Sequence, residues 1–250
     1  MPGKSEPERY DRQIPVFGEA GQERIRNANV FIAGAGGLGS PVSMYLAAAG
    51  IGRIRIVDHD TVDISNLNRQ LLHGISDLGR QKTVSARETL TEMNTDVEID
   101  AVSKKIDESN VFELASDCDL IIDAMDNFHA RYLLNKAAVA RNIPLFHGAV
   151  HGFDGQVTTV IPGKTPCLRC IFPGTHPKTA IPAIGATCGV IASVQVTEVL
   201  KYLTGIGTLA TNRLLIWDGL NTVMNEISLE RNPKCQDCGD YRDCGDESIE

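Results

Sequence analysis

The chain has 250 residues, with 24 lysines and arginines against 32 aspartates and glutamates, and its formal net charge is −8. An acidic balance of this size argues against a nucleic-acid surface, so we expect no nucleic-acid partner. The length suffices for one large α/β domain or two fused lobes. The N-terminal stretch is polar, and the charge-free run 179–197 contains Pro182 and Gln195, which predicts a loop and a buried helix. We therefore expect a cytoplasmic protein without a membrane span.

A glycine-rich turn follows the first predicted strand, which ends at Ala33. Its glycines are Gly34, Gly36, Gly37 and Gly39. Their spacing lets the backbone approach a phosphate, and the N-terminus of the next helix adds free N–H groups and a positive dipole end. A helix is expected after the turn, with apolar residues at helical spacing as far as Ala49 and Gly50 at its end. The pattern predicts a nucleotide-binding βαβ unit.

The second predicted strand runs over residues 54–57 and ends beside an acid. Asp58 follows Gly39 by 19 residues, where a carboxylate usually accepts hydrogen bonds from ribose hydroxyls. The alternative is a tight turn that binds no ligand. It is disfavoured because strand, glycine turn, helix and acid occur in the expected order. The turn alone does not distinguish NAD, FAD and ATP.

Cations downstream favour a triphosphate. Asn66, Arg69 and Lys82 follow the second strand. An arginine fork and a lysine point charge neutralise phosphates and stabilise the charge that develops when a phosphoryl group is attacked. A solvated surface charge is the alternative for any single basic residue. This alternative fits Arg69 and Lys82 less well, because both follow the glycine turn and the second strand in the chain order that a nucleotide site would need.

A further predicted strand, 119–123, leads into Asp126 and Asn127. The carboxyl ends of parallel strands face the ligand crevice, so Asp126 is placed to hold magnesium on the phosphates. The alternative has equal weight: Asp126 could be the N-cap of the predicted helix 128–140, because Asp and Asn are preferred caps.

Two Cys-x-x-Cys pairs lie 64 residues apart. They are Cys167 with Cys170 and Cys235 with Cys238. Two such pairs suit a closed, structural zinc site with four thiolate ligands. A redox dithiol or disulfides are the alternatives, and iron–sulfur ligation is possible by residue type. Two pairs without an export signal favour zinc, which would join the C-terminal segment to the rest of the fold.

Several motifs in one order now identify a resemblance that covers nearly the whole chain. The chain resembles the ThiF/MoeB/HesA family, relatives of ubiquitin-activating enzymes. The motifs are Arg12-Gln-Ile, Gly34-Ala-Gly-Gly-Leu-Gly39, Asp58-His-Asp60, Ser65-Asn-Leu-Asn-Arg69-Gln70, Gly79-Arg-Gln-Lys82, Asp126-Asn127, Cys167-Leu-Arg-Cys170 and Asn232-Pro-Lys-Cys235-Gln-Asp-Cys238.

The resemblance implies an enzyme that uses ATP and magnesium to adenylate the C-terminal glycine of a small ubiquitin-like (β-grasp) sulfur carrier ending in Gly-Gly. It implies catalytic roles for Arg69, Lys82 and Asp126, and for Arg12 crossing a homodimer interface into the partner's ATP site. The implied nucleotide contacts are Gly34, Gly36, Gly37, Gly39, Asp58, Asp60, Ser65, Asn66, Leu67, Asn68, Arg69, Gln70, Lys82, Asp126 and Asn127.

The fold class expected is Rossmann-like α/β, a mostly parallel sheet with helices on both faces, extended by antiparallel strands and a structural zinc site. We expect one adenylation domain over 1–238, with a nucleotide-binding half at 28–150 and a hairpin, crossover loop and zinc region at 151–238. Strands are expected at 153–161 and 213–218. Residues 239–250 form an acidic tail, expected to be disordered. One of the helices near 19–27, 80–93 or 190–203 is expected to contribute to a dimer face.

Many members of the family carry a cysteine on the crossover loop that forms a thioester or acyl-disulfide. Residues 171–182 contain none, and Cys188 comes later, at the start of the predicted helix 190–203. A small buried helix residue is the favoured interpretation of Cys188. Cys118 is interpreted as a core or edge residue and Cys244 as an idle tail residue. We expect adenylation without a covalent protein intermediate, with sulfur delivered by another protein.

Other functions remain open from the sequence. The activated carboxylate could belong to a carrier for molybdopterin or thiamine-thiazole synthesis, to a modifier used in protein conjugation, or to a peptide or small molecule. An NAD-dependent oxidoreductase and a non-catalytic binding module are the remaining alternatives. Arg69, Lys82 and Asp126 count against both of them.

Overall fold

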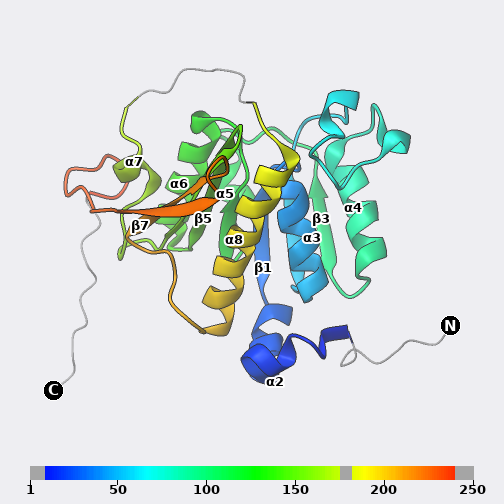
Figure 1. The fold of residues 1–250 in the computed structure, drawn as a ribbon, viewed down its shortest axis with the longest axis horizontal. Helices are drawn as coiled ribbons and strands as arrows, with labels where there is room; N and C mark the ends of the chain where they lie inside the picture. The colour runs from blue at the N-terminus through cyan, green and yellow to red at the C-terminus, as the bar shows by residue number, and fades with distance from the viewer. Residues whose placement is uncertain (1–8, 175–181, 240–250) are drawn as a thin grey trace.

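One eight-stranded sheet runs through the protein, whose computed structural model describes residues 9–174 and 182–239. The strand order is β3-β2-β1-β4-β5-β6-β7-β8 (Figure 1). The strands are β1 Asn29–Ala33, β2 Arg53–Val57, β3 Glu98–Val102, β4 Leu120–Asp123, β5 Leu145–His151, β6 Asp154–Val160, β7 Arg213–Asp218 and β8 Val223–Ser228. The first five strands pair in parallel, and β6, β7 and β8 extend the sheet with antiparallel pairs.

Helices cover both faces of the sheet. Figure 1 shows α3 (Gly39–Ala49), α4 (Lys82–Met93) and α8 (Gly185–Thr204) in front of it, and α5 (Val111–Leu114) and α6 (Phe128–Arg141) behind it. The shorter pieces are α7 Leu168–Ile171, η1 Ile64–Asn66 and η2 Ile75–Asp77, and α2 Ile14–Arg26 lies at the opposite end of α8 from the cavity described below. This arrangement confirms the expected fold class.

The central strands are apolar on both sides because each side packs on helices. Along β1, Val30 and Ile32 join the core that contains α3 and α8, whereas Phe31 and Ala33 join the core that contains α6. All four side chains are fully buried. A parallel strand that packs on helices at both faces therefore needs a continuous apolar run, without alternating polar residues.

The strand order reverses between β1 and β4, since the chain proceeds from β1 to β2 and β3 on one side and then to β4 and β5 on the other. In open α/β sheets a crevice forms outside the carboxyl ends of the strands at such a point. The glycine turn after β1 and the Asp126 loop after β4 both lie there.

Several boundaries differ from the sequence-based expectation. The predicted helix 190–203 begins earlier, at Gly185, and the helix expected at 19–27 begins at Ile14 with a kink at Gly18, whose φ is +72°. Strand β8 was not expected at all. Residues 240–250, including Cys244, and residues 175–181 of the crossover loop lie outside the described residues.

None of the helices in the described ranges combines the length and the hydropathy that a membrane crossing needs.

Candidate functional site

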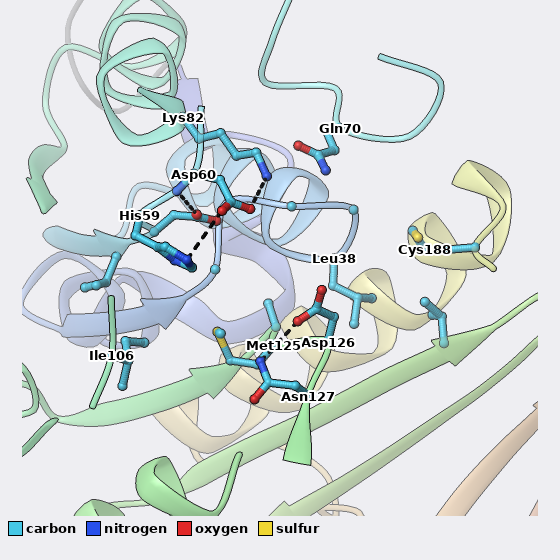
Figure 2. Close-up of a pocket in the computed structure, with 18 of the residues that line it drawn as sticks. Leu38, His59, Asp60, Gln70, Lys82, Ile106, Met125, Asp126, Asn127 and Cys188 are labelled. Atoms are coloured by element: carbon cyan, nitrogen blue, oxygen red, sulfur yellow. Dashed lines mark hydrogen bonds and ion pairs between the residues drawn. The ribbon is translucent and has the colours of Figure 1, made fainter. Parts of the chain in front are cut away.

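A cavity of about 380 Å³ opens at the carboxyl ends of β1, β2 and β4, and we call it the strand-end cavity (Figure 2). A volume of this order is typical of small-molecule sites. Of the predicted nucleotide contacts it is lined by Gly34, Gly36, Gly37, Asp58, Asp60, Arg69, Gln70, Lys82, Asp126 and Asn127. The fold thus brings together residues from five separate segments of the chain.

The glycine turn is tightly constrained. Gly34 has a φ of +104°, and a Cβ there would lie 2.9 Å from the carbonyl oxygen of Ala124. A Cβ on Gly39 would lie only 1.9 Å from the carbonyl oxygen of Gly34, so both positions require glycine. Gly39 begins α3 behind the turn and does not itself line the cavity.

Two buried or half-buried groups hold the Ala35 peptide inside that turn. Its N–H donates to Asp58 Oδ2 at 2.8 Å, and its carbonyl accepts from His73 Nε2 at 3.2 Å. His73 Nδ1 meets the hydroxyl of Ser85 at 2.9 Å, and burial lowers the pKa of His73. A neutral ring with its proton on Nε2 fits these contacts. The sequence analysis missed His73.

The Asp58 carboxylate organises the strand end as well as facing the cavity. Its second oxygen, Oδ1, accepts from the backbone N–H of Asp60 at 2.9 Å. Asp58 therefore ties the end of β2 to the glycine turn, a structural task that the sequence pattern did not reveal. Its expected contact with a ribose stays a prediction.

Lys82 is almost wholly buried, although lysine rarely is, because it has a partner. Its Nζ lies 2.9 Å from Asp60 Oδ2, and its side chain is 6% exposed. Lys82 is the first residue of α4, and its N–H donates to the carbonyl of Asp60 at 3.0 Å. Figure 2 shows this pair on one side of the strand-end cavity and Asp126 on the other. The cation is thus fixed at the cavity rather than solvated.

Arg69 also lines the cavity, held by its own loop. Its NH1 donates to the carbonyl of Ser65 and to Asn68 Oδ1, both at 2.9 Å. The neighbouring Gln70 is buried, and its Oε1 has no hydrogen-bond partner among the described residues. A buried acceptor without a partner is costly.

Four further predicted nucleotide contacts do not line the cavity: Ser65, Asn66, Leu67 and Asn68. Asn66 instead completes a capping arrangement around η1, in which its Oδ1 accepts from the N–H of Asp63 at 3.1 Å. Ser65 and Asn68 supply the oxygens that orient Arg69. These residues hold the guanidinium of Arg69 in position from outside the cavity.

The two interpretations of Asp126 are separated by the structure. Asn127 is the N-cap of α6, and its Oδ1 accepts from the N–H of Ala130 at 2.9 Å. Asp126 is exposed at the cavity and accepts a 3.2 Å hydrogen bond from Asn127 Nδ2. Because the cap role belongs to its neighbour, the Asp126 carboxylate remains available to a ligand or a cation.

Arg131 is a lining residue that the sequence analysis missed. Its side chain is 5% exposed, and its NH2 donates to the carbonyl of Met125 at 2.7 Å. The available signal was its position in α6, four residues after the cap Asn127, which returns it to the cavity after one turn. Lys104 and His59 also line the cavity, and Val57, Ile106 and Met125 give it an apolar end.

Cys188 is buried near the start of α8, as expected, and it also lines the cavity, which was not expected. A Cβ on Gly37 would lie 3.0 Å from its Sγ. Burial raises the pKa of the Cys188 thiol, and the nearby charge of Arg69 offsets only part of this. A buried thiol with a raised pKa is a poor nucleophile.

Arg12 is exposed just before α2 and does not line the cavity of its own chain. Figure 1 shows α2 beyond the amino ends of the strands, at the end of the sheet remote from the cavity. The role of Arg12 in a partner's ATP site stays a prediction.

The four predicted zinc ligands meet at what we call the cysteine corner: Cys167, Cys170, Cys235 and Cys238. Sγ separations are 3.5 Å between Cys167 and Cys235 and 3.4 Å between Cys170 and Cys238. Four sulfurs around one zinc ion lie about 3.8 Å apart, which follows from a Zn–S distance of about 2.3 Å. The thiol geometry and donor set therefore fit zinc.

The ThiF family model matches residues 10–237. The chain is 41% identical over 250 residues to the sulfur carrier protein adenylyltransferase of Thermus thermophilus, covering 95% of this chain and 92% of that protein. It is 40% identical to the SAMP-activating enzyme E1 of Haloferax volcanii, covering 93% and 89%. Among solved structures, Escherichia coli MccB with ATP matches the fold with a TM-score of 0.84 at 24% identity, over 96% of this chain and 77% of that chain. The chain belongs to the ThiF family.

Proposed function

We propose that the protein uses ATP to adenylate the C-terminal glycine carboxylate of a small ubiquitin-like sulfur carrier, with release of pyrophosphate. The observation that carries the proposal is the set of Arg69, Lys82 and Asp126 around a cavity whose floor is a glycine turn. Relatives with 41% and 40% identity are named as a sulfur carrier protein adenylyltransferase and a SAMP-activating E1, which supports the same chemistry.

The lining of the cavity suits ATP. Its apolar end, with Val57 and Ile106, would receive the base, and Asp58 at the end of β2 would face the ribose. The glycine turn at the start of α3 would approach the phosphates with free N–H groups. Arg69 and Lys82 then lie where a triphosphate needs positive charge.

Asp126 would hold a magnesium ion on the phosphates. Magnesium prefers carboxylate oxygens, substrate phosphates and water, and Asp126 offers an exposed carboxylate at the cavity. Such an ion would neutralise phosphate charge and polarise the oxygens of the group under attack.

The reaction needs positioning more than it needs a base, because a carboxylate is already a nucleophile. A carboxylate oxygen of the carrier would form a bond to the α-phosphorus, and the bond from that phosphorus to the bridging oxygen would break. Pyrophosphate would leave with that bonding pair, and an acyl-adenylate would remain. Arg69 and Lys82 would stabilise the charge that develops on the phosphates.

The carrier tail would enter beside the β5–β6 hairpin. Val150 and Ala183 line the cavity on that side, and Gly152 forms a β-bridge with Ala183. Phe153 at the tip of the hairpin is 49% exposed. Small side chains on that side would leave room for a Gly-Gly terminus. The exposed Phe153 would contact the folded part of the carrier.

A second copy of the chain would supply Arg12. Because Arg12 does not line its own cavity, we propose a homodimer in which it reaches the cavity of the partner. The cysteine corner would hold a structural zinc ion that fastens the segment before residue 239 to α6 and α7.

The test is pyrophosphate exchange into ATP, measured with and without purified β-grasp proteins that end in Gly-Gly. We expect exchange that depends on the carrier and is lost when the last glycine is removed. Exchange that no such carrier stimulates would exclude the sulfur-carrier proposal, and tight NAD binding without ATP binding would replace it with a redox function.

A further inference from the structure

Asp123, the last residue of β4, is fully buried, three residues before Asp126. Its Oδ1 accepts from the N–H of Met125 at 3.0 Å. The other end of the same residue is also held, because the Met125 carbonyl accepts from Arg131 NH2 at 2.7 Å. Asp123 and Arg131 therefore bind both backbone groups of Met125, the residue directly before Asp126.

A buried carboxylate keeps its position only if its oxygens have partners. The second oxygen, Oδ2, lies 2.7 Å from His147 Nδ1 and 3.6 Å from Arg131 Nε. The carbonyl of Asp123 accepts a further hydrogen bond, at 3.0 Å, from Gln195 of α8. His147 is the closest of these partners and is itself fully buried on the neighbouring strand β5.

The protonation of His147 follows from its other contact. Its Nε2 lies 3.2 Å from Nε2 of Gln156, which is an amide nitrogen and only donates. Nε2 of His147 therefore accepts, and Nδ1 carries the proton that is donated to Asp123. The accepting Nε2 requires a neutral ring, and burial lowers the pKa of His147 in spite of the opposing effect of Asp123. Phe172 packs on it, with ring centroids 5.5 Å apart.

We propose that His147 is a positioning residue: through Asp123 it holds the loop that carries Asp126 in the geometry that a divalent cation needs. The proposal rests on the function proposed above. His147 does not line the cavity, so it would not contact a nucleotide bound there. Its effect passes through one hydrogen bond to Asp123 and then through the backbone of Met125. Groups that hydrogen-bond a metal ligand directly alter metal affinity by about 10- to 100-fold, and His147 acts one contact further out, so we expect an effect at the lower end of that range.

Two substitutions separate the hydrogen bond from the volume of the ring. His147→Phe keeps an aromatic ring against Phe172 and removes the N–H. His147→Asn is smaller but places an amide N–H near the position of Nδ1, so it can still donate to Asp123. His151→Asn, at the exposed end of the same strand, is the matched control.

The first readout is Mn²⁺ affinity in the presence of a non-hydrolysable ATP analogue, followed by electron paramagnetic resonance. It needs neither turnover nor carrier. We expect His147→Phe to weaken Mn²⁺ binding about tenfold or more, while His147→Asn and the His151 control stay within about threefold of wild type. The Mg²⁺ concentration for half-maximal pyrophosphate exchange should rise in parallel.

Equal Mn²⁺ affinity in all four proteins would overturn the proposal, even if His147→Phe melts at a lower temperature, because His147 would then be only a packing residue. If zinc content and circular dichroism show that His147→Phe is unfolded, His147→Leu replaces it. If that variant also fails to fold, His147→Asn decides: a tenfold loss of Mn²⁺ affinity with the hydrogen bond to Asp123 retained contradicts the proposal. If the wild-type protein binds Mn²⁺ and ATP but catalyses no pyrophosphate exchange, the proposed function is refuted. The Mn²⁺ affinities of the variants would still decide whether His147 is a positioning residue.

Discussion

The strand-end cavity and the cysteine corner both gather groups that hold ions, but they are built in opposite ways. The cavity places charges of both signs around an open space, with a nearly buried Lys82 beside an exposed Asp60. The cysteine corner brings four thiols within 4.8 Å of one another and leaves no carboxylate or histidine among them. The first arrangement can take up and release a charged ligand, whereas the second suits closure around a single ion.

The difference teaches where each kind of substitution should act. In the cavity, each charged side chain lines a space that the proposed ligand would enter, so its loss should lower turnover more than stability. In the cysteine corner the thiols join α7 to the segment before residue 239, so their loss should lower stability more than turnover. The following predictions test that division, from the largest effect to the smallest.

Asp126→Ala should reduce carrier-dependent pyrophosphate exchange by about 1,000-fold or more, because the proposed metal would lose the carboxylate that we assign to it. Zinc content, measured by atomic absorption, and the melting temperature should stay at wild-type values, since Asp126 is exposed and Asn127 caps α6. Normal turnover by the variant would show that our assignment of the metal to Asp126 is wrong.

Lys82→Ala should lower the exchange rate by about 100- to 1,000-fold through the loss of one cation that we propose faces the phosphates. The loss also leaves Asp60 without its 2.9 Å partner, so the negative charge at the cavity increases. Lys105→Ala is the matched control, because Lys105 is exposed in the segment after β3 and does not line the cavity. Equal rates in the two variants would argue against a phosphate role for Lys82.

Arg12→Ala should lower exchange by about 100-fold if the arginine acts across a dimer interface. Mixing Arg12→Ala with Asp126→Ala subunits should then restore activity, because each mixed dimer contains one cavity with both groups intact. Random exchange of subunits predicts recovery of about a quarter of the wild-type rate, given a two-fold symmetric dimer. No recovery, with subunit exchange verified by mass spectrometry, would contradict the crossing.

Cys235→Ser should remove the zinc ion and lower the melting temperature by about 10 °C, because the two cysteine pairs would no longer be joined. The rate of pyrophosphate exchange, measured well below the melting temperature of the variant, should stay within about threefold of wild type. Calorimetry and a zinc assay check the first expectation. A rate that falls as far as in Lys82→Ala, with the fold retained, would give the cysteine corner a catalytic task and break the comparison.

Cys188→Ala should have the smallest effect, with exchange within about threefold of wild type. The thiol is buried with a raised pKa, and alanine keeps the Cβ beside the glycine turn. Mass spectrometry of the reaction should show no carrier attached to Cys188. Loss of exchange, or a carrier bound through a thioester, would restore a covalent role for this cysteine.

The sequence predicted those parts of the cavity whose signals are local. The glycine turn, Asp58 and the two cysteine pairs are recognisable because backbone conformation or ligand chemistry restricts the residue type at each position. The N-terminus of α8 was misplaced because Gly185 and Gly189 are poor helix formers, and packing against β5 and β6 overrides that preference. Strand β8 was missed because its residues are exposed, so it has no apolar face that alternation could reveal.

The buried histidines were missed for a different reason. His73 and His147 act on the Ala35 peptide and on Asp123, which are 38 and 24 residues away in the sequence. No spacing rule connects such pairs, because the contacts exist only after the sheet has formed. Arg131 was overlooked because an arginine inside a predicted helix resembles any solvated charge until Asn127 is known to cap that helix.

The most direct test of the central claim is to identify the product on the carrier. The protein, a β-grasp carrier ending in Gly-Gly, and ATP labelled at the α-phosphate should give a carrier with labelled AMP at its C-terminal carboxylate. Tandem mass spectrometry should place the AMP on the last glycine, and Asp126→Ala should give no such product. The account would be contradicted if the protein binds ATP but the label stays on free ATP and AMP with every carrier that is tested.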